Sequence, residues 1–192
     1  GGIPAVSLMD GEVERALMQG YTKEQLDWYA GMDAKRMSDC AAYIAVRGGN
    51  NVFESSDVPQ EKKRLYSVNY SQHVHMEIRV PKTRWVVLRY PSSAMAQQAG
   101  MSTEAFEDFF FKVCTLDYRA MSRAMDPLVE LMQRTDKVRL TARGTDLRFS
   151  IKGQTAIKCD GFLNIPDGEV YTSPIRDSIE GVLQYNTPSL YQ

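Results

Sequence analysis

The stretch Asp136–Gly153, reading DKVRLTARGTDLRFSIKG, marks the place where the organisation of the chain changes. Apolar and polar residues alternate on both sides of a Gly-Thr-Asp turn signal at residues 144–146. This period of two is typical of a strand with one buried face. The stretch therefore predicts an antiparallel β-hairpin with one polar face. We expect its apolar face to carry Val138, Leu140, Ala142, Leu147, Phe149 and Ile151.

Upstream of the hairpin, short apolar runs alternate with segments of helical periodicity. The apolar runs at residues 3–9, 42–46 and 85–88 are nearly continuous, as strands of a buried parallel sheet are. Strands that alternate with helices favour a parallel sheet covered by those helices. We therefore expect an α/β protein with two parts. Residues 1–135 form a parallel-sheet domain truncated at its amino end, and residues 136–192 begin an antiparallel, β-rich domain truncated at its carboxyl end.

Local signals place the helix ends. Thr22 and Gln25 have the spacing of a capping box. Pro59 fits the start of a helix that runs to about residues 74–76. Asp126-Pro127 fits an N-cap followed by proline at the first helical position, so the helical region from about residue 102 to 135 is expected to break there.

Composition and charge argue against several classes of protein. The 192 residues carry a formal net charge of -1, which gives no basic field for nucleic acid. No apolar run reaches the roughly 18–20 residues that a membrane helix needs. The three cysteines, Cys40, Cys114 and Cys159, are far apart and outside any CxxC pair, so we expect reduced thiols in a cytoplasmic protein. We expect no nucleic-acid partner and no membrane partner.

One carboxylate is presented in a distinctive way. In Asn164–Pro174, NIPDGEVYTSP, Glu169 follows the turn signal Pro166-Asp167-Gly168 and precedes residues that favour strands. A rigid turn that delivers an acid onto the first residue of a strand fixes that acid in space. Such a carboxylate can bind a divalent metal or act as a general base. It can also be an ordinary surface residue, and spacing alone leaves these alternatives open.

The other candidates are weaker. His73 and His75 could share a metal in a strand, but their surroundings are helical, and residues two apart on a helix do not face each other. Gly48-Gly49 does not belong to a phosphate-binding motif and is expected to form a tight turn. At least one of the three aromatics at residues 109–111 is expected in the core. The hairpin arginines could meet an acidic ligand, although a solvated strand face is the ordinary interpretation: they are Arg139, Arg143 and Arg148.

Three segments in order resemble the M29 metallopeptidases, a family of bacterial and archaeal aminopeptidases. The first is WVVLRYPSSAMAQQAGMSTEAFEDFFF at residues 85–111. The second is LDYRAMSRAMDPL at residues 116–128, followed by the hairpin stretch at 136–153. The third is NIPDGEVYTSP with the later IEGVLQYNTPSLYQ. The part upstream of residue 82 is consistent with the family's α/β domain and matches it less closely.

The resemblance implies a function for Glu169. In the M29 family the acid of the GEV(F/Y)T segment is the first ligand of a two-metal site, built with Zn, Co, Mn or Mg. The other ligands and a catalytic Tyr come later in the sequence, so here they are expected beyond Gln192. The resemblance thus implies a homodimeric aminopeptidase acting on peptides, in which residues 136–192 begin the catalytic domain. The alternative is a non-catalytic α/β ligand-binding or interaction module whose helices at 102–135 form a partner surface.

Overall fold

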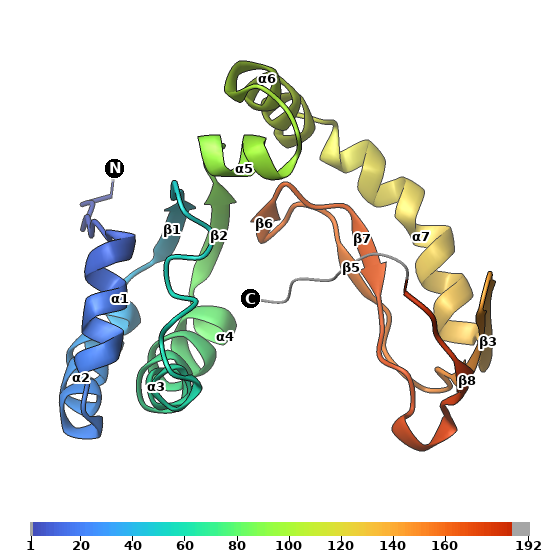
Figure 1. Cartoon of the computed structure of the whole chain (residues 1–192), viewed down its shortest axis with the longest axis horizontal. Helices are drawn as coiled ribbons and strands as arrows, with labels where there is room; N and C mark the ends of the chain where they lie inside the picture. Colours follow the sequence, from blue (N-terminus) through green and yellow to red (C-terminus); the bar gives the residue numbers. More distant parts are fainter. Residues whose placement is uncertain (1, 186–192) are drawn as a thin grey trace. The chain divides into compact units, whose positions relative to one another are not determined.

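The computed structural model describes residues 2–185, which fold into two compact units (Figure 1). The first unit ends at Cys114 and also takes in the short segment Leu163–Pro166. The second unit comprises Thr115–Phe162 and resumes at Asp167. No helix in the described part is long and apolar enough to cross a membrane. The protein is α/β, as predicted, and a domain boundary at residue 136 stays a prediction.

A parallel sheet forms the centre of the first unit. Its order is β1-β2-β6, and β1 pairs with β2 from Ala42↔Arg84 to Arg47↔Arg89. The short β6 adds to the other edge of β2, with Leu88 opposite Ile165. The strands are β1 (Ala42–Arg47), β2 (Arg84–Arg89) and β6 (Asn164–Ile165). The strands predicted at residues 42–46 and 85–88 are confirmed.

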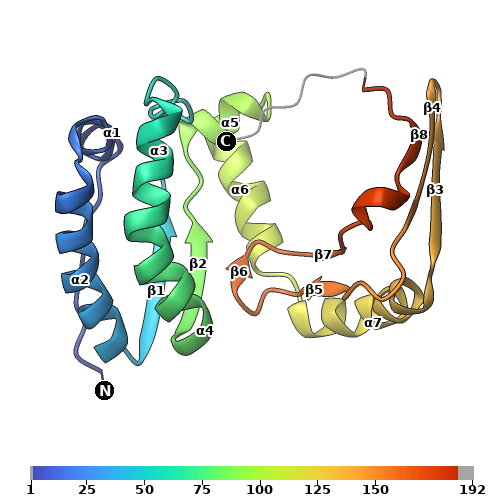
Figure 2. The same cartoon turned by 90° about the horizontal axis from the view of Figure 1, so that it is seen from below.

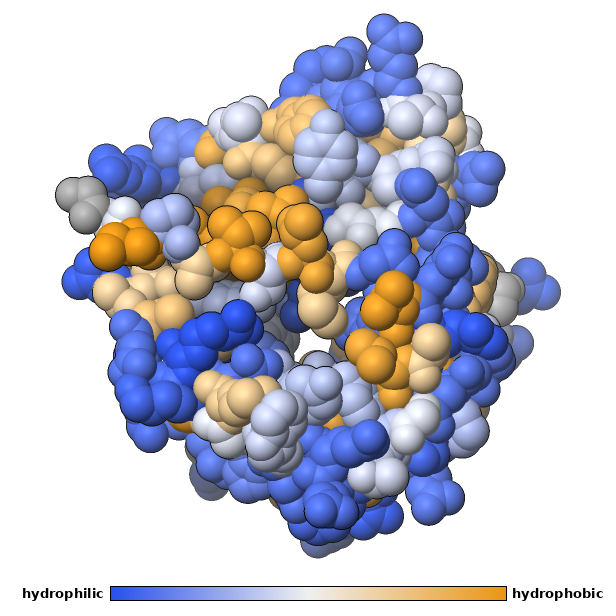
Figure 3. All heavy atoms as spheres, turned by 90° about the vertical axis from the view of Figure 1, so that its left-hand side faces the viewer, coloured by the Kyte–Doolittle hydropathy of each residue, from blue (hydrophilic) through white to orange (hydrophobic). Residues whose placement is uncertain are grey.

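The strand predicted at residues 3–9 is wrong. This stretch has no regular structure between Gly2 and Asp10, and Ile3 is 100% exposed. An apolar run becomes a strand only where a neighbouring strand satisfies its backbone N–H and C=O groups, and no described strand pairs with it. Exposed apolar residues continue on β1, where Ile44 and Val46 are also exposed. Figure 3 views the molecule from the α1–α2 side and shows apolar side chains gathered in a band on that face.

The helices of the first unit pack through apolar side chains. Their bounds are α1 (Gly11–Gly20), α2 (Lys23–Asp39), α3 (Gln60–Tyr66), the π-helix η1 (Ser67–Arg79), α4 (Val80–Lys82), α5 (Ser93–Gln98) and α6 (Thr103–Cys114). Figure 2 shows α2 and α3 on the same side of β1 and β2. The α2–η1 contact buries Ala30, Met37 and Val74. A second cluster joins α5 to α6 and includes Phe110, so the aromatic run does contribute to the core.

The helix starts follow their sequence signals, with one shift. The capping box is confirmed: Thr22 Oγ1 accepts from the Gln25 amide at 3.2 Å, and Gln25 Oε1 accepts from the Thr22 amide at 3.0 Å. Pro59 lies just before the first helical residue instead of at it. The helical segment that it precedes continues through η1 and α4 to Lys82, past the predicted end.

The second unit contains one long helix and two antiparallel groups of strands. The helix is α7 (Tyr118–Arg134), and the strands are β3 (Lys137–Ala142), β4 (Thr145–Ser150), β5 (Ile157–Cys159), β7 (Glu169–Tyr171) and β8 (Glu180–Val182), with a 3-10 turn η2 (Arg176–Ser178). The first group has the order β3-β4-β8, and β5 pairs with β7 in a separate ribbon. The hairpin is confirmed, with Leu140 opposite Leu147. Its loop is shorter than predicted because Thr145 already pairs with Ala142.

The predicted helix break at Asp126-Pro127 is wrong. Helix α7 is continuous and holds Pro127 in its interior. The break lies earlier, where Asp117 caps α7 and accepts a hydrogen bond from the Ala120 amide at 2.9 Å. The Asp126 carboxylate instead binds the Lys158 ammonium at 2.7 Å. An Asp-Pro dipeptide can begin a helix or lie within one. Here the aspartate binds Lys158, which is distant in sequence, and does not cap a helix.

Candidate metal-binding site

Glu169 is the first residue of β7, as the turn signal before it predicts. Its side chain is exposed, and across the ribbon it stands opposite Cys159 of β5. Directly opposed residues of an antiparallel pair project from the same face, and neighbours along a strand project from opposite faces. Glu169 and Cys159 therefore share one face of the ribbon, while Lys158 and Val170 share the other.

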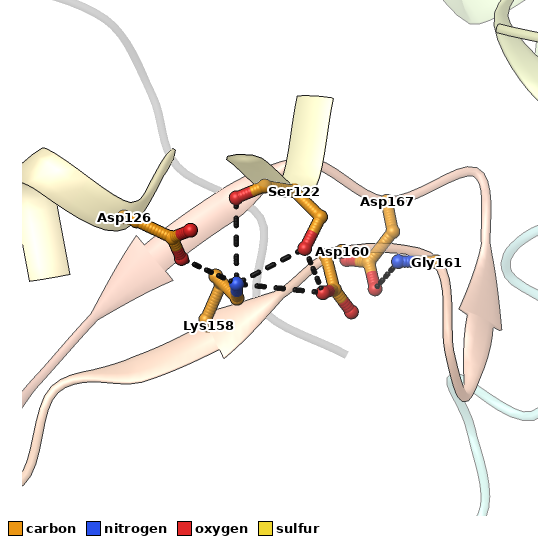
Figure 4. Close-up of polar contacts among 6 residues, drawn as sticks. All are labelled: Ser122, Asp126, Lys158, Asp160, Gly161 and Asp167. Atoms are coloured by element: carbon orange, nitrogen blue, oxygen red, sulfur yellow. Dashed lines mark hydrogen bonds and ion pairs between the residues drawn. The ribbon is translucent and has the colours of Figure 1, made fainter. Parts of the chain in front are cut away.

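Lys158 ties the ribbon to α7 (Figure 4). Its Nζ donates to Asp126 Oδ1 at 2.7 Å and to Ser122 Oγ at 3.0 Å. The Ser122 hydroxyl donates to Asp160 Oδ2 at 2.6 Å, and that oxygen lies 3.8 Å from Lys158 Nζ. The hydrogen bond to Asp126 raises the pKa of Lys158. The lysine is therefore a charged anchor and not a general base at neutral pH.

The segment between β5 and β7 includes β6, and its two flanking loops are held by a hydrogen bond to each other and by a contact with α7. The Gly161 amide donates to Asp167 Oδ2 at 3.1 Å, and the Asp167 amide donates to the Tyr118 hydroxyl at 3.3 Å. Gly161 has φ of 83°, and a Cβ at this position would lie 2.4 Å from Tyr118 Cδ1. Only glycine lets the loop approach the ring this closely. The loop therefore delivers the chain to Glu169 along a defined path.

Cys159, opposite Glu169, lies near several acidic side chains. The pKa of the Cys159 thiol is raised, first by burial and then by the charges of Asp167, Glu169 and Asp160. The exposed carboxylate of Glu169 is a hard oxygen donor that suits divalent metals. Within residues 2–185, however, no three His, Cys, Asp or Glu side chains converge as a metal site would require. Glu169 therefore fits one position of a metal site, and the described residues do not complete that site.

The side chains of both histidines interact with neighbouring residues of η1. His73 Nδ1 lies 3.2 Å from Glu77 Oε2, and His75 Nδ1 accepts from Arg79 Nε at 3.1 Å. The helical setting predicted for them is confirmed. Burial, followed by the charges of Arg79 and Arg47, lowers the pKa of His75.

The remaining candidates have ordinary structural roles. Asp146 pairs with both Arg139 at 2.8 Å and Arg148 at 3.1 Å, on exposed side chains. Arg143 lies in the hairpin loop, between the last residue of β3 and the first of β4. Gly48-Gly49 follows β1 in an irregular connection. The exposed pairs with Asp146 and the loop position of Arg143 favour the interpretation of the hairpin arginines as a solvated surface.

Ser122, Asp126, Lys158 and Asp160 were missed by sequence reasoning. The hydrogen bonds that join them cross 32 to 38 positions of sequence. No local pattern of spacing signals such a contact. Only a pairing of α7 with the ribbon, which the sequence alone did not predict, would have drawn attention to them.

Comparison with known proteins identifies the family. The sequence model of the thermophilic metalloproteases (M29) matches residues 3–192. The chain belongs to the M29 family. This match confirms the resemblance noted in the three sequence segments. It also shows that the M29 chain belongs to a family of metalloproteases.

A solved structure shares the fold of this M29 chain. Wild-type AmpT from Thermus thermophilus superposes with a TM-score of 0.68 and 22% sequence identity. The match covers 90% of this chain and 50% of the AmpT chain, so the M29 chain spans about half the length of that structure. Among curated proteins, no sequence matches it significantly.

Proposed function

We propose that this M29 chain belongs to a metal-dependent aminopeptidase that removes N-terminal residues from peptides, with Glu169 as one metal ligand. The observation that carries the proposal is the exposed Glu169 carboxylate on the first residue of β7. Membership of a metalloprotease family supports the class of reaction. The remaining ligands would come from outside the described residues, so that this chain contributes one ligand.

The ligand chemistry around Glu169 favours a hard divalent ion. Cys159 stands opposite Glu169, and burial, followed by nearby acidic charges, raises the pKa of its thiol. A carboxylate oxygen suits Zn, Co, Mn or Mg without strong discrimination. We propose that the complete site would hold two such ions, with Glu169 as one ligand, and that they would supply an activated water and a Lewis acid for the scissile carbonyl.

The residues of this chain would orient that ligand. Lys158 anchors one face of the ribbon to α7, which leaves the Cys159–Glu169 face free of that contact. Asp167 and Tyr118 hold the loop that precedes Glu169. These contacts hold in place the backbone that leads to Glu169.

The test is a substitution in the intact protein. Glu169→Gln removes the charge and keeps the shape, and we expect kcat/KM for leucine-4-nitroanilide, with Co or Zn added, to fall by at least about 100-fold. Glu180→Gln is the matched control, because Glu180 is also an exposed acid on the first residue of a strand. Equal activity of the two variants would reject Glu169 as a ligand. Absence of any metal-dependent hydrolysis would favour the non-catalytic module instead.

Metal titration tests whether the ligand set is incomplete. Because Glu169 alone cannot hold a divalent ion tightly against water, we expect calorimetry on residues 1–192 to show no stoichiometric binding of Zn or Co at micromolar concentration. Tight binding by this chain would contradict the assignment of a single ligand to it.

We further propose that the protein acts as a homodimer in the cytoplasm. Cys40, Cys114 and Cys159 are all free thiols, which suits a reducing compartment. The homodimer rests on the family resemblance. Light scattering on the intact protein measures its mass, and a mass equal to one chain would reject the dimer.

A further inference from the structure

A pocket of about 370 Å³ opens between the start of α7 and the loop that follows β5. Its α7 wall includes Arg119 and Arg123, and its loop wall is formed by residues 160–162. All of these residues belong to the second unit. The pocket is distinct from the Cys159–Glu169 face of the ribbon, but it lies at the same end of it, because Asp160 directly follows Cys159.

Two arginines of the pocket have no ion-pair partner among the described residues. Arg119 and Arg123 are exposed and lie four positions apart, so they project from the same face of α7. One carboxylate, that of Asp160, also lines the pocket; it accepts from Ser122 and lies 3.8 Å from Lys158, so the two guanidinium groups outnumber it. Neither arginine forms an ion pair with another residue in the range 2–185. Two like charges at this spacing repel each other, and a bound anion would relieve that repulsion.

The opposite wall joins the Asp160 carboxylate to an exposed aromatic ring on a fixed loop. Phe162 is 83% exposed although it is a large aromatic residue. The Gly161 backbone beside it is held by the Asp167 carboxylate and lies against the Tyr118 ring. An aromatic surface presented on a fixed loop, across from two guanidinium groups, suits a ligand with an apolar group next to a carboxylate.

We propose that this pocket binds the C-terminal α-carboxylate of a short peptide substrate, with Arg119 and Arg123 on the carboxylate and Phe162 against the last side chain. The inference rests on the proposed aminopeptidase function and adds a substrate class to it: short peptides with a free, apolar C-terminal residue. Guanidinium groups bind carboxylates more strongly than they bind neutral amides, so amidation of the peptide removes the recognised group.

The experiment compares Leu-Ala-Phe with its C-terminal amide as substrates of the intact protein. We expect KM for the acid to be about tenfold lower than KM for the amide. In the double variant Arg119→Gln/Arg123→Gln the two KM values should become equal. Arg134→Gln is the matched control, because it removes the same charge from the last turn of α7 without lining the pocket, and it should keep the preference for the acid.

Each outcome decides the inference. Equal KM values in the unaltered protein, or a preference that survives in the double variant, would overturn it. If the intact protein fails to hydrolyse leucine-4-nitroanilide, the aminopeptidase proposal fails separately. The pocket is then tested by calorimetry with N-acetyl-Ala-Phe, its amide and inorganic phosphate. Binding of the acid alone, lost in the double variant, supports the pocket; binding of phosphate but not of the acid overturns it.

Discussion

In the first unit, α2 and η1 meet through buried apolar side chains such as Ala30 and Val74, whereas in the second unit α7 meets the β5–β7 ribbon through Lys158, Ser122 and two aspartates. Helix α7 buries none of its residues completely, although it is as long as α2. The contrast teaches that the two parts resist disruption by different means. Apolar burial joins these two helices of the first unit, and directional polar contacts join α7 to the ribbon that carries the proposed metal ligand.

The largest expected effect tests burial in the first unit. Leu26 of α2 is 1% exposed, so Leu26→Ala leaves a cavity and should lower the free energy of unfolding by about 2–5 kcal/mol. Chemical denaturation measures the cost in each unit: tryptophan fluorescence reports the first unit, where Trp28 and Trp85 both lie, and amide hydrogen exchange reports α7. Leu128→Ala in α7 is the control, and at 46% exposure we expect it to cost less than about 1 kcal/mol. Equal costs at the two leucines would erase the contrast between the units.

A smaller effect tests the polar contacts of the second unit. Ser122→Ala removes the hydroxyl that donates to Asp160 and accepts from Lys158. We expect the free energy of opening of the β5–β7 ribbon, measured by amide hydrogen exchange, to fall by about 1–2 kcal/mol. Ser173→Ala, at an exposed position beyond β7, should leave the exchange unchanged. Unchanged exchange in Ser122→Ala would show that apolar contacts also govern the second unit.

The smallest effect is a difference in pH response. The lowered pKa of His75 means that the unfolded chain binds a proton there before the folded chain does. The free energy of unfolding of the first unit should therefore fall as the pH drops below about 6.5, the pKa of histidine in the unfolded chain. This loss should end once the pH is below the pKa of His75 in the folded protein. The fluorescence-monitored unfolding midpoint, compared at pH 7.5 and 5.5, measures the loss.

The histidine positions supply the controls for this pH effect. His75→Gln should flatten the dependence, because glutamine can still accept from Arg79 without titrating, whereas His73→Gln should keep it. Both histidines lie in the first unit, so exchange in the β5–β7 ribbon should show no loss due to histidine over the same range. A midpoint that stays constant between the two pH values would contradict a burial effect at His75.

Much of the fold could be predicted where one local signal was enough. The alternation at residues 137–150 produced the hairpin, and the Thr22–Gln25 spacing produced a capping box with both of its hydrogen bonds. The strand expected at residues 3–9 failed because a strand needs a partner, and apolar composition does not supply one. The break expected at Asp126-Pro127 failed because Lys158 binds that aspartate inside a continuous helix.

The candidate site shows the same division. The turn before Glu169 could be predicted from Pro166-Asp167-Gly168, and the family resemblance was confirmed by the match over residues 3–192. The residues that hold the ribbon could not be predicted, since their spacing carries no periodicity. The sequence also did not predict the pocket formed by Arg119, Arg123 and Phe162. Its two walls are distant in sequence, since Phe162 follows Arg123 by 39 positions.

The sequence by itself determined the period of each segment, the ends of several helices and the turn that presents Glu169, because these depend on backbone preferences within a few residues. The tertiary structure alone decided which apolar run found a strand partner, which aspartate capped α7, and which charges neutralised one another. Those outcomes depend on groups that are distant in sequence and become neighbours only when the chain folds. Local chemistry therefore placed the Glu169 carboxylate on a strand, and long-range contacts determined what surrounds it.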